Sequence, residues 1–210
     1  MKRFEIITEA DARVLEPGTT VVLAPRGHIT PLAQDTLRSR RITVVRDDQL
    51  TPLEGALRPV SPVKILAVGS DHTGLPLKQA LAARLRSSGV TVQDLGTHDA
   101  TPVDYPDIAA AVGRAVAAGE AEAGLVIDGG GLGSAIAANK IDGIRAAMCT
   151  DETTARYSRE HNGANVLCLG ASLVTTEQAV TIVEVWMRTA MREPRYVRRL
   201  AKIQALERRR

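Results

Sequence analysis

The sequence predicts an α/β protein whose main part is a five-stranded, parallel, doubly wound sheet of Rossmann-like type, preceded by a small N-terminal α/β appendage. From Val63 onward, short apolar runs alternate with helix-length amphipathic stretches, which is the pattern of βαβ units. The runs are apolar on both faces, as expected for parallel strands that helices cover on both sides. Right-handed crossovers leave few topologies, and the flavodoxin-type order 2-1-3-4-5 is the simplest of them.

Strands and helices are expected in regular alternation along this main part. The expected strands are 64–69, 90–96, 123–128, 144–149 and 165–170. The expected helices are 75–87, 107–118, 132–140, 152–161 and 175–191. Each strand is thereby followed by one helix, as a doubly wound sheet requires.

The first 62 residues show a different pattern. Residues 8–11 (Thr-Glu-Ala-Asp) are typical of a helix start, and Thr30-Pro31 are typical of an N-cap followed by proline at the first helical position. Short strands are expected at 19–23 and 42–46, and the proline-containing stretch 47–62 is expected to be a linker. We therefore expect an appendage with linker at 1–62, a catalytic-type domain at 63–191 and a basic C-terminal helix at 192–210.

The composition excludes several classes of protein. With 210 residues, 44% of them apolar and 24% charged, the chain has a globular composition. No apolar run approaches the ~18 to 20 residues of a membrane span and no signal-type stretch follows the start, so we expect a cytosolic protein without a membrane partner. Five aromatic residues are too few for the stacking surfaces of single-stranded nucleic-acid binders. Cys149 and Cys168 lie in apolar runs without further ligands, which favours buried thiols over a metal site.

Charge is concentrated at the C-terminus. Residues 192–210 carry 8 basic and 2 acidic side chains, whereas residues 63–191 carry 10 and 14. A short basic helix either binds anions or is simply solvated.

The strongest functional signal is a glycine-rich loop between an expected strand and helix. It reads Asp128-Gly129-Gly130-Gly131-Leu-Gly133-Ser134, so that free backbone N–H groups converge at a helix start, where an anion or a developing oxyanion can bind. The spacing fits neither the dinucleotide fingerprint nor the P-loop. The alternative is a tight turn that serves only helix packing.

Two histidine-containing pairs lie near expected strand ends. Asp71-His72 follows the first strand of the main part, and His161-Asn162 ends the helix before the last strand. Each histidine alone is more often structural. Together with the glycine loop, however, they form three polar groups that we expect on one rim of the sheet, at its switch point.

These motifs together resemble those of the type B ribose-5-phosphate isomerases, a family that includes galactose-6-phosphate isomerase subunits and other aldose-ketose phosphate isomerases. The resemblance runs in unbroken order over about residues 63–203. It rests on six segments: 69–74 (Gly-Ser-Asp-His-Thr-Gly), 104–106 (Asp-Tyr-Pro), 128–133, 137–140 (Ala-Ala-Asn-Lys), 143–146 (Gly-Ile-Arg-Ala) and 158–162 (Ser-Arg-Glu-His-Asn).

The resemblance implies a role for each matching residue. Asp71 and His72 would border the sugar, Tyr105 would line the pocket, and residues 129–133 would cradle the oxyanion of an enediolate. His161 would help to open the sugar ring, with Asn162 beside it. Arg195 and Arg199 would bind the phosphate in the neighbouring subunit's site, and Arg145 is a further candidate anion contact. The family activity implies no cofactor and no metal, and the shared site implies a homodimer or homotetramer.

The glycine loop departs from the family pattern. Many relatives have Cys at the position of Asp128 and Thr at that of Gly130, and others place Glu at that of Ser134. Here Asp128 is the only carboxylate in the loop, so we expect it to be the base that forms the enediolate. Ser134 and backbone N–H groups remain as donors to the oxyanion.

Three hypotheses follow for function. The first is isomerisation of D-ribose 5-phosphate to D-ribulose 5-phosphate through a cis-enediolate. The second keeps the chemistry but takes a tetrose phosphate or a hexose 6-phosphate. The third is a catalytically silent sugar-phosphate-binding or assembly protein. The appendage weakly resembles segments of enzymes associated with bacterial microcompartments, which would make residues 1–62 a sorting element; a lineage-specific extension is the alternative. Nucleic-acid binding by the basic tail is not expected.

Overall fold

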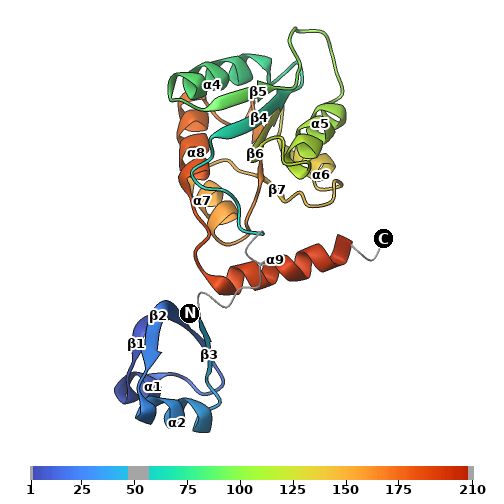
Figure 1. Cartoon of the computed structure of the whole chain (residues 1–210). Coiled ribbons are helices and arrows are strands. Elements are labelled where there is room, and N and C mark those ends of the chain that lie inside the picture. The colour runs from blue at the N-terminus through green and yellow to red at the C-terminus, as the bar shows by residue number, and fades with distance from the viewer. Residues whose placement is uncertain (1, 47–56, 208–210) are drawn as a thin grey trace. The chain divides into compact units, whose positions relative to one another are not determined.

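The computed structural model describes residues 2–46 and 57–207 and divides the chain into two compact units (Figure 1). The smaller unit is Met1–Gly55 with Glu193–Arg195, and the larger unit is Ala56–Arg192 with Tyr196–Arg210. Part of the expected linker, residues 47–56, lies outside the described residues. The three-part division expected above stays a prediction.

The larger unit is built on a five-stranded parallel sheet, as predicted. Its strands are β4 (Ile65–Ser70), β5 (Thr91–Asp94), β6 (Ala123–Asp128), β7 (Ala146–Met148) and β8 (Val166–Gly170). The order across the sheet is β5-β4-β6-β8-β7, and every neighbouring pair is parallel. The chain reverses its direction of winding between β4 and β6, so this is the switch point where ligands bind in such sheets.

The expected strand order is wrong in its last two strands. In chain order the sheet is 2-1-3-5-4, because β8 lies beside β6 and β7 takes the edge. The physical reason is burial: all five residues of β8 are buried, whereas the three residues of β7 are only partly buried. The more apolar strand occupies the interior position, and a short strand suits an edge.

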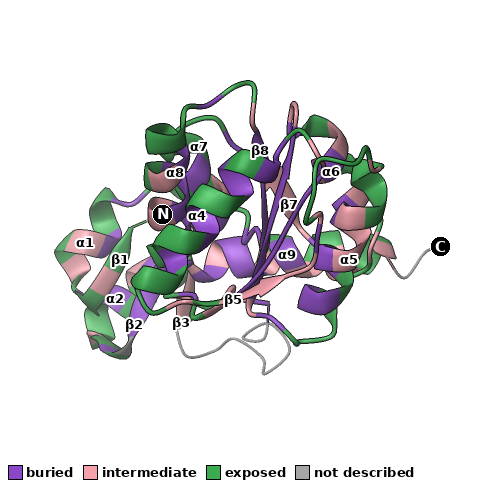
Figure 2. Ribbon diagram, turned by 90° about the horizontal axis from the view of Figure 1, so that it is seen from above, coloured by how far each residue is buried: buried purple, intermediate pink, exposed green. Residues whose placement is uncertain are grey.

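Helices cover both faces of this sheet (Figure 2). Buried side chains of α4 (Leu75–Ser87), α7 (Glu152–Glu160) and α8 (Thr176–Arg188) pack on one face. Those of α5 (Tyr105–Ala117) and α6 (Leu132–Ala138) pack on the other. Cys149 and Cys168 are buried free thiols, and burial raises the pKa of both.

The last helix, α9 (Pro194–Glu207), runs across the amino-terminal ends of the strands (Figure 1). Leu200 packs so closely on Gly163 that a Cβ atom there would lie 2.5 Å from the leucine Cδ1. At the other end of the helix, the Glu207 carboxylate accepts a hydrogen bond of 3.0 Å from the backbone N–H of Gly143. Residues that immediately precede β7 and β8 therefore anchor α9.

The smaller unit is also α/β. Its parallel strands lie in the order β1 (Arg3–Ile7), β2 (Thr20–Ile29), β3 (Thr43–Arg46), with α1 (Glu9–Val14) and α2 (Pro31–Ser39) as crossovers. The predicted helix starts are confirmed, and Thr8 forms a reciprocal capping box with Asp11. The sequence analysis missed β1. A separate cluster of apolar side chains gives the unit its own core.

No helix in the described parts of the chain is long and apolar enough to span a bilayer.

Candidate active site

The glycine loop joins the carboxyl end of β6 to the start of α6. Gly131 has a φ of 73°, in the left-handed region that favours glycine, and a Cβ atom there would lie 2.9 Å from the backbone nitrogen of Gly170. Gly170 itself packs against Gly130: a Cβ atom on Gly170 would lie 2.7 Å from the carbonyl oxygen of Gly130. Glycine is therefore required where this loop passes the end of β8.

Four hydrogen bonds hold the Asp128 carboxylate in place. One oxygen accepts the backbone N–H of Gly130 at 2.8 Å and also that of Gly131, and the other accepts both the backbone N–H of Ser134, at 3.0 Å, and its hydroxyl. The residue is 3% exposed. A carboxylate has about four lone-pair positions, so these donors occupy all of them. Asp128 thus shapes the loop, and only the Ser134 hydroxyl can rotate to release an acceptor position.

Tyr105, the first residue of α5, packs over the same loop. A Cβ atom on Gly133 would lie 2.5 Å from the tyrosine ring, far closer than a methyl group tolerates. The ring therefore lies on a surface that only glycine leaves open, and Tyr105 is 39% exposed.

We expect Gly133→Ala to displace Tyr105 and to raise the KM for substrate, by about 5-fold if ~1 kcal/mol of aromatic contact is lost. Steady-state kinetics check this result, and Gly130→Ala is the matched control in the same loop, since Gly130 has no positive φ and a Cβ there meets no atom within 4 Å. Unchanged kinetics in a folded Gly133→Ala variant would contradict a role for the packing of Tyr105 on Gly133.

Asp71 and His72 lie beside the glycine loop. One oxygen of Asp71 accepts hydrogen bonds from the backbone N–H groups of Thr73 and Gly74, both at 2.9 Å, and from the Thr73 hydroxyl at 2.6 Å. A Cβ on Gly129 would meet that hydroxyl at 3.5 Å, which places the two loops in contact. His72 Nδ1 accepts the N–H of Val103 at 3.4 Å, so its proton sits on Nε2. We call Asp71, His72, Tyr105 and residues 128–134 the glycine-loop site.

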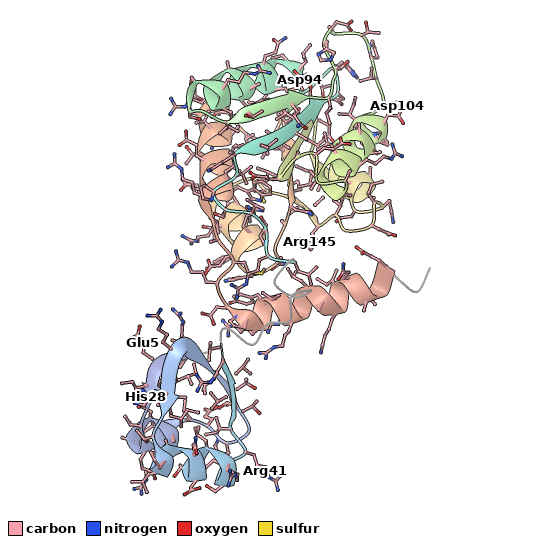
Figure 3. The ribbon with its side chains drawn as sticks, viewed as in Figure 1. Glu5, His28, Arg41, Asp94, Asp104 and Arg145 are labelled. Atoms are coloured by element: carbon pink, nitrogen blue, oxygen red, sulfur yellow. The ribbon has the colours of Figure 1, made fainter. Side chains whose placement is uncertain are left out.

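The expectation that all three polar groups share one rim is wrong. His161 and Asn162 follow α7, which carries the chain from the carboxyl end of β7 back to the amino end of β8. Because the strands are parallel, the two residues lie on the rim opposite the glycine-loop site. Figure 3 shows the two ends of this unit, with Asp104 at the start of α5 far from Arg145, which precedes β7.

Aromatic rings surround His161 on this second rim. Its ring stacks on Tyr157 at a centroid distance of 4.5 Å and packs against the tilted ring of Tyr196 at 4.7 Å. Arg199 lies on α9 within 5.7 Å of the Tyr196 ring, and Arg195 lies one turn earlier in the same helix. We call His161, Asn162, Arg199 and the two tyrosines the histidine site. Neither Tyr157 nor Tyr196 was among the residues selected from the sequence.

Arg145 has a structural role in this chain. Its guanidinium donates to the carbonyls of Gly163 at 2.7 Å, Gly143 at 3.3 Å and Leu57 at 3.4 Å. Burial lowers its pKa, and the charge of Glu207 acts in the opposite direction. Its donors are thus committed to main-chain carbonyls rather than to a free anion position.

Arg159, which the sequence analysis did not select, is fully buried nearby. It donates to the carbonyls of Ala164, at 2.8 Å, and Val60, and its guanidinium lies 4.4 Å from the ring of Trp186. Burial, with a smaller contribution from the charge of Arg145, lowers its pKa to about 10. No sequence signal distinguishes Arg159 from the chain's other arginines.

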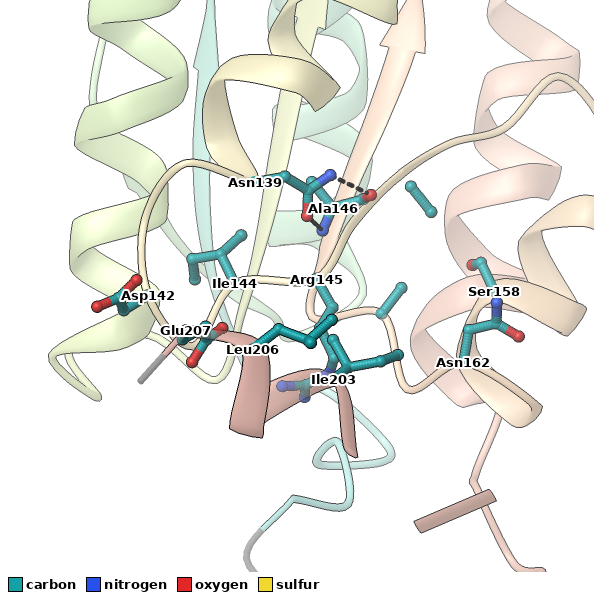
Figure 4. A pocket seen from close by; sticks show the side chains of 12 residues that line it. Asn139, Asp142, Ile144, Arg145, Ala146, Ser158, Asn162, Ile203, Leu206 and Glu207 are labelled. Atoms are coloured by element: carbon teal, nitrogen blue, oxygen red, sulfur yellow. Dashed lines mark hydrogen bonds between the residues drawn. The ribbon is translucent and has the colours of Figure 1, made fainter. Parts of the chain in front are cut away.

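A pocket of ≈ 330 Å³ opens beside the histidine site (Figure 4). Asn162 and Ser158 line one side of it, and Ile203, Leu206 and Glu207 of α9 line another. Asn139 is fixed at its edge by two hydrogen bonds with the backbone of Ala146, at 2.8 and 2.9 Å. The second rim is therefore hollowed next to Asn162.

Comparisons with known proteins agree with this architecture. The family model "Ribose/Galactose Isomerase" matches residues 66–203. Ribose-5-phosphate isomerase B of Escherichia coli is 43% identical over 148 residues, which cover 70% of this chain and 99% of that protein. The structure of ribose-5-phosphate isomerase B from Clostridium thermocellum aligns with a TM-score of 0.68 at 46% identity, over 69% of this chain and 98% of that one. The Mycoplasma genitalium enzyme with bound ribulose-5-phosphate aligns with a TM-score of 0.66 at 36% identity, over 69% and 96%.

Proposed function

The chain belongs to the ribose/galactose isomerase family, and on this premise we propose that it interconverts an aldose phosphate and a ketose phosphate, with D-ribose 5-phosphate and D-ribulose 5-phosphate as the substrate pair. The observation that carries the proposal is the glycine-loop site, where a buried carboxylate and a Ser hydroxyl lie within one loop at the switch point of the sheet. The reaction needs only proton transfers, so no cofactor enters it.

In the proposed mechanism, Asp128 is the base. The Ser134 hydroxyl turns from the carboxylate to the substrate carbonyl oxygen, and the freed oxygen of Asp128 takes the proton from C2 of the open-chain aldose. The electron pair of the C2–H bond forms the C1–C2 double bond of an enediolate, whose negative oxygen Ser134 and the first N–H groups of α6 stabilise. Return of the proton to C1, with movement of the O2 proton to O1, gives the ketose.

The histidine site would act on the same substrate from a second copy of the chain. The strands between the two rims have about five residues, so the rims are separated by roughly 16 Å. A five-carbon sugar phosphate is too short to touch both. A complete site therefore needs the glycine-loop site of one subunit and the histidine site of another, with His161 opening the ring and Arg195 and Arg199 binding the phosphate.

An apolar strip marks where the second copy would bind. Leu132 and Ile136 lie one turn apart on α6 and are 62% and 64% exposed, and Ile203 and Leu206 of α9 are also exposed. Helix α6 runs from the first rim toward the second. A two-fold axis near its middle would place each rim of one subunit against the opposite rim of its partner, in a homodimer or in half of a homotetramer.

A panel of phosphorylated sugars tests the substrate. We expect the highest kcat/KM with ribose 5-phosphate, compared with a tetrose phosphate and a hexose 6-phosphate in the same assay. A higher value for the tetrose or the hexose would transfer the proposal to that chain length, which residues 97–104 and the altered glycine loop leave open.

Deuterium incorporation separates catalysis from binding. An isomerase introduces solvent deuterium at C2 of the aldose or C1 of the ketose, whereas a silent sugar-phosphate-binding protein does not. Binding of ribose 5-phosphate without any exchange would replace the enzyme proposal by the binding one.

We propose that residues 1–62 form an appendage that directs the protein to a bacterial microcompartment within the cytosol. The separate apolar core of this appendage supports an independent role.

A further inference from the structure

We propose that Tyr157 and Tyr196 are positioning residues, which hold the imidazole of His161 between their rings so that only its edge faces the sugar. The inference rests on the proposed function, in which His161 opens the sugar ring. It adds two residues on two different helices to the machinery of that step.

Two aromatic rings contact the imidazole. The planes of Tyr157 and His161 are inclined by 20° at a centroid distance of 4.5 Å, and those of His161 and Tyr196 by 37° at 4.7 Å. Aromatic rings at these distances are in contact. The imidazole thus packs against rings from two different helices, and its two nitrogens lie on the ring edge.

The ring edge has no partner within the described part of the chain. Neither nitrogen of His161 forms a hydrogen bond there, although the residue is partly buried and its own backbone N–H bonds to the Tyr157 carbonyl at 3.0 Å. Buried or half-buried polar groups normally find partners. A fixed imidazole with an unused edge is therefore prepared for a ligand.

Core packing does not explain Tyr157. Tyr157 is 47% exposed, whereas Tyr196 is 7% exposed. The chain contains only three tyrosines, and two of them contact this one histidine. An exposed ring that covers a histidine one turn away contributes little to the core, but it does restrict rotation of the imidazole.

The stack also connects two parts of the histidine site. Arg156 lies 5.4 Å from the centroid of Tyr157, and Arg199 lies 5.7 Å from that of Tyr196. These distances fall within the ~6 Å range of cation–π attraction. Tyr196 thus contacts both the ring-opening group and a phosphate-binding arginine, so it fixes their spacing.

Ring opening needs this control of direction. A nitrogen of His161 takes the proton from the hydroxyl on C1, the O–H electron pair forms the C1 carbonyl, and the bond between C1 and the ring oxygen breaks toward that oxygen. The ring oxygen takes a proton from water, and the imidazolium then returns its own proton to the solvent. Transfer requires heavy-atom distances of about 2.6 to 3.2 Å along one line. An imidazole free to rotate would satisfy this only part of the time.

The test compares net conversion of ribose 5-phosphate with solvent deuterium incorporation at C1 of saturating ribulose 5-phosphate. The ketose has no ring to open, because its C5 oxygen carries the phosphate, so the exchange reports enediolate formation alone. We expect Tyr157→Leu and Tyr196→Leu each to slow net conversion about 5- to 10-fold, the value of one aromatic contact, while exchange stays within about twofold of the parent. Tyr157→Phe and Tyr196→Phe keep the ring, so each should convert ribose 5-phosphate faster than the corresponding leucine variant.

Two results would overturn the inference: leucine variants that convert ribose 5-phosphate as fast as the phenylalanine variants, or exchange that falls in proportion to net conversion. Tyr157 is the safer position, since its exposed side chain can be replaced without loss of folding, and its variants decide the question if Tyr196→Leu does not fold. Failure of the proposed function gives a different result, in which the parent enzyme itself shows no exchange.

Discussion

Asp128→Asn should reduce kcat at least about 100-fold with a modest change in KM, because the amide cannot accept the C2 proton. The side chain stays nearly the same size. Its carbonyl oxygen can still accept the N–H groups of Gly130 and Gly131, as the carboxylate does now. The measurement is kcat for ribose 5-phosphate together with deuterium exchange at C2, and both should fall by the same factor.

The loop itself must be controlled for in this experiment. Asparagine places an NH2 group against the backbone N–H of Ser134, so one hydrogen bond of the loop is lost, at a cost of about 1 to 3 kcal/mol of stability. Ser134→Ala is the matched control for loop stability, since it removes a donor to the same carboxylate oxygen. A thermal melt of both variants shows whether the loop has loosened to a similar degree.

The outcome distinguishes two roles for the carboxylate. If Asp128 is only the acceptor that shapes the loop, Asp128→Asn and Ser134→Ala should have similar, small effects on kcat. A kcat within a few-fold of the parent in a folded Asp128→Asn enzyme would therefore eliminate this residue as the base. Asp128→Cys offers a gain-of-function comparison, because it introduces the thiol that many relatives of this family carry.

The larger unit was predictable because its apolar pattern is strong. Strand β6 and helix α4 have the bounds that the sequence indicated, since both are long, buried and clearly delimited. The order of β7 and β8 was not predictable from alternation alone, because periodicity says nothing about which strand lies at an edge. Strand β1 (Arg3–Ile7) was missed because no turn signal precedes it. Its residues also do not alternate regularly between buried and exposed positions.

The candidate site was predictable as a set of residues but not as an arrangement. The position of His161 at the end of α7 already implied the opposite rim, since a crossover helix must return to the start of the next parallel strand. The bonds from Asp128 to its own loop could not be read from the sequence, because Asp followed by glycines also suits an open, solvated turn. The stacking of Tyr196 on His161 joins residues 35 positions apart and depends on where α9 crosses the strand ends.

Mixing two inactive variants should restore activity if the site is shared between subunits. Asp128→Asn inactivates the glycine-loop site and His161→Ala the histidine site, and each loss should be of the order of 10²-fold or more. In a hybrid dimer, one site combines the intact Asp128 of one chain with the intact His161 of the other, while the second site carries both defects. Random pairing would then give about one quarter of the parent activity, far above either variant alone.

Activity in the hybrid is expected because Asp128 and His161 lie far apart within one chain. Both lie in the larger unit, on opposite rims of a single sheet, so no rotation of side chains brings them together. Co-expression with two different affinity tags isolates the hybrid. A purified hybrid no more active than its parents would show that each chain works alone, and Asp128 and His161 could then not serve one reaction.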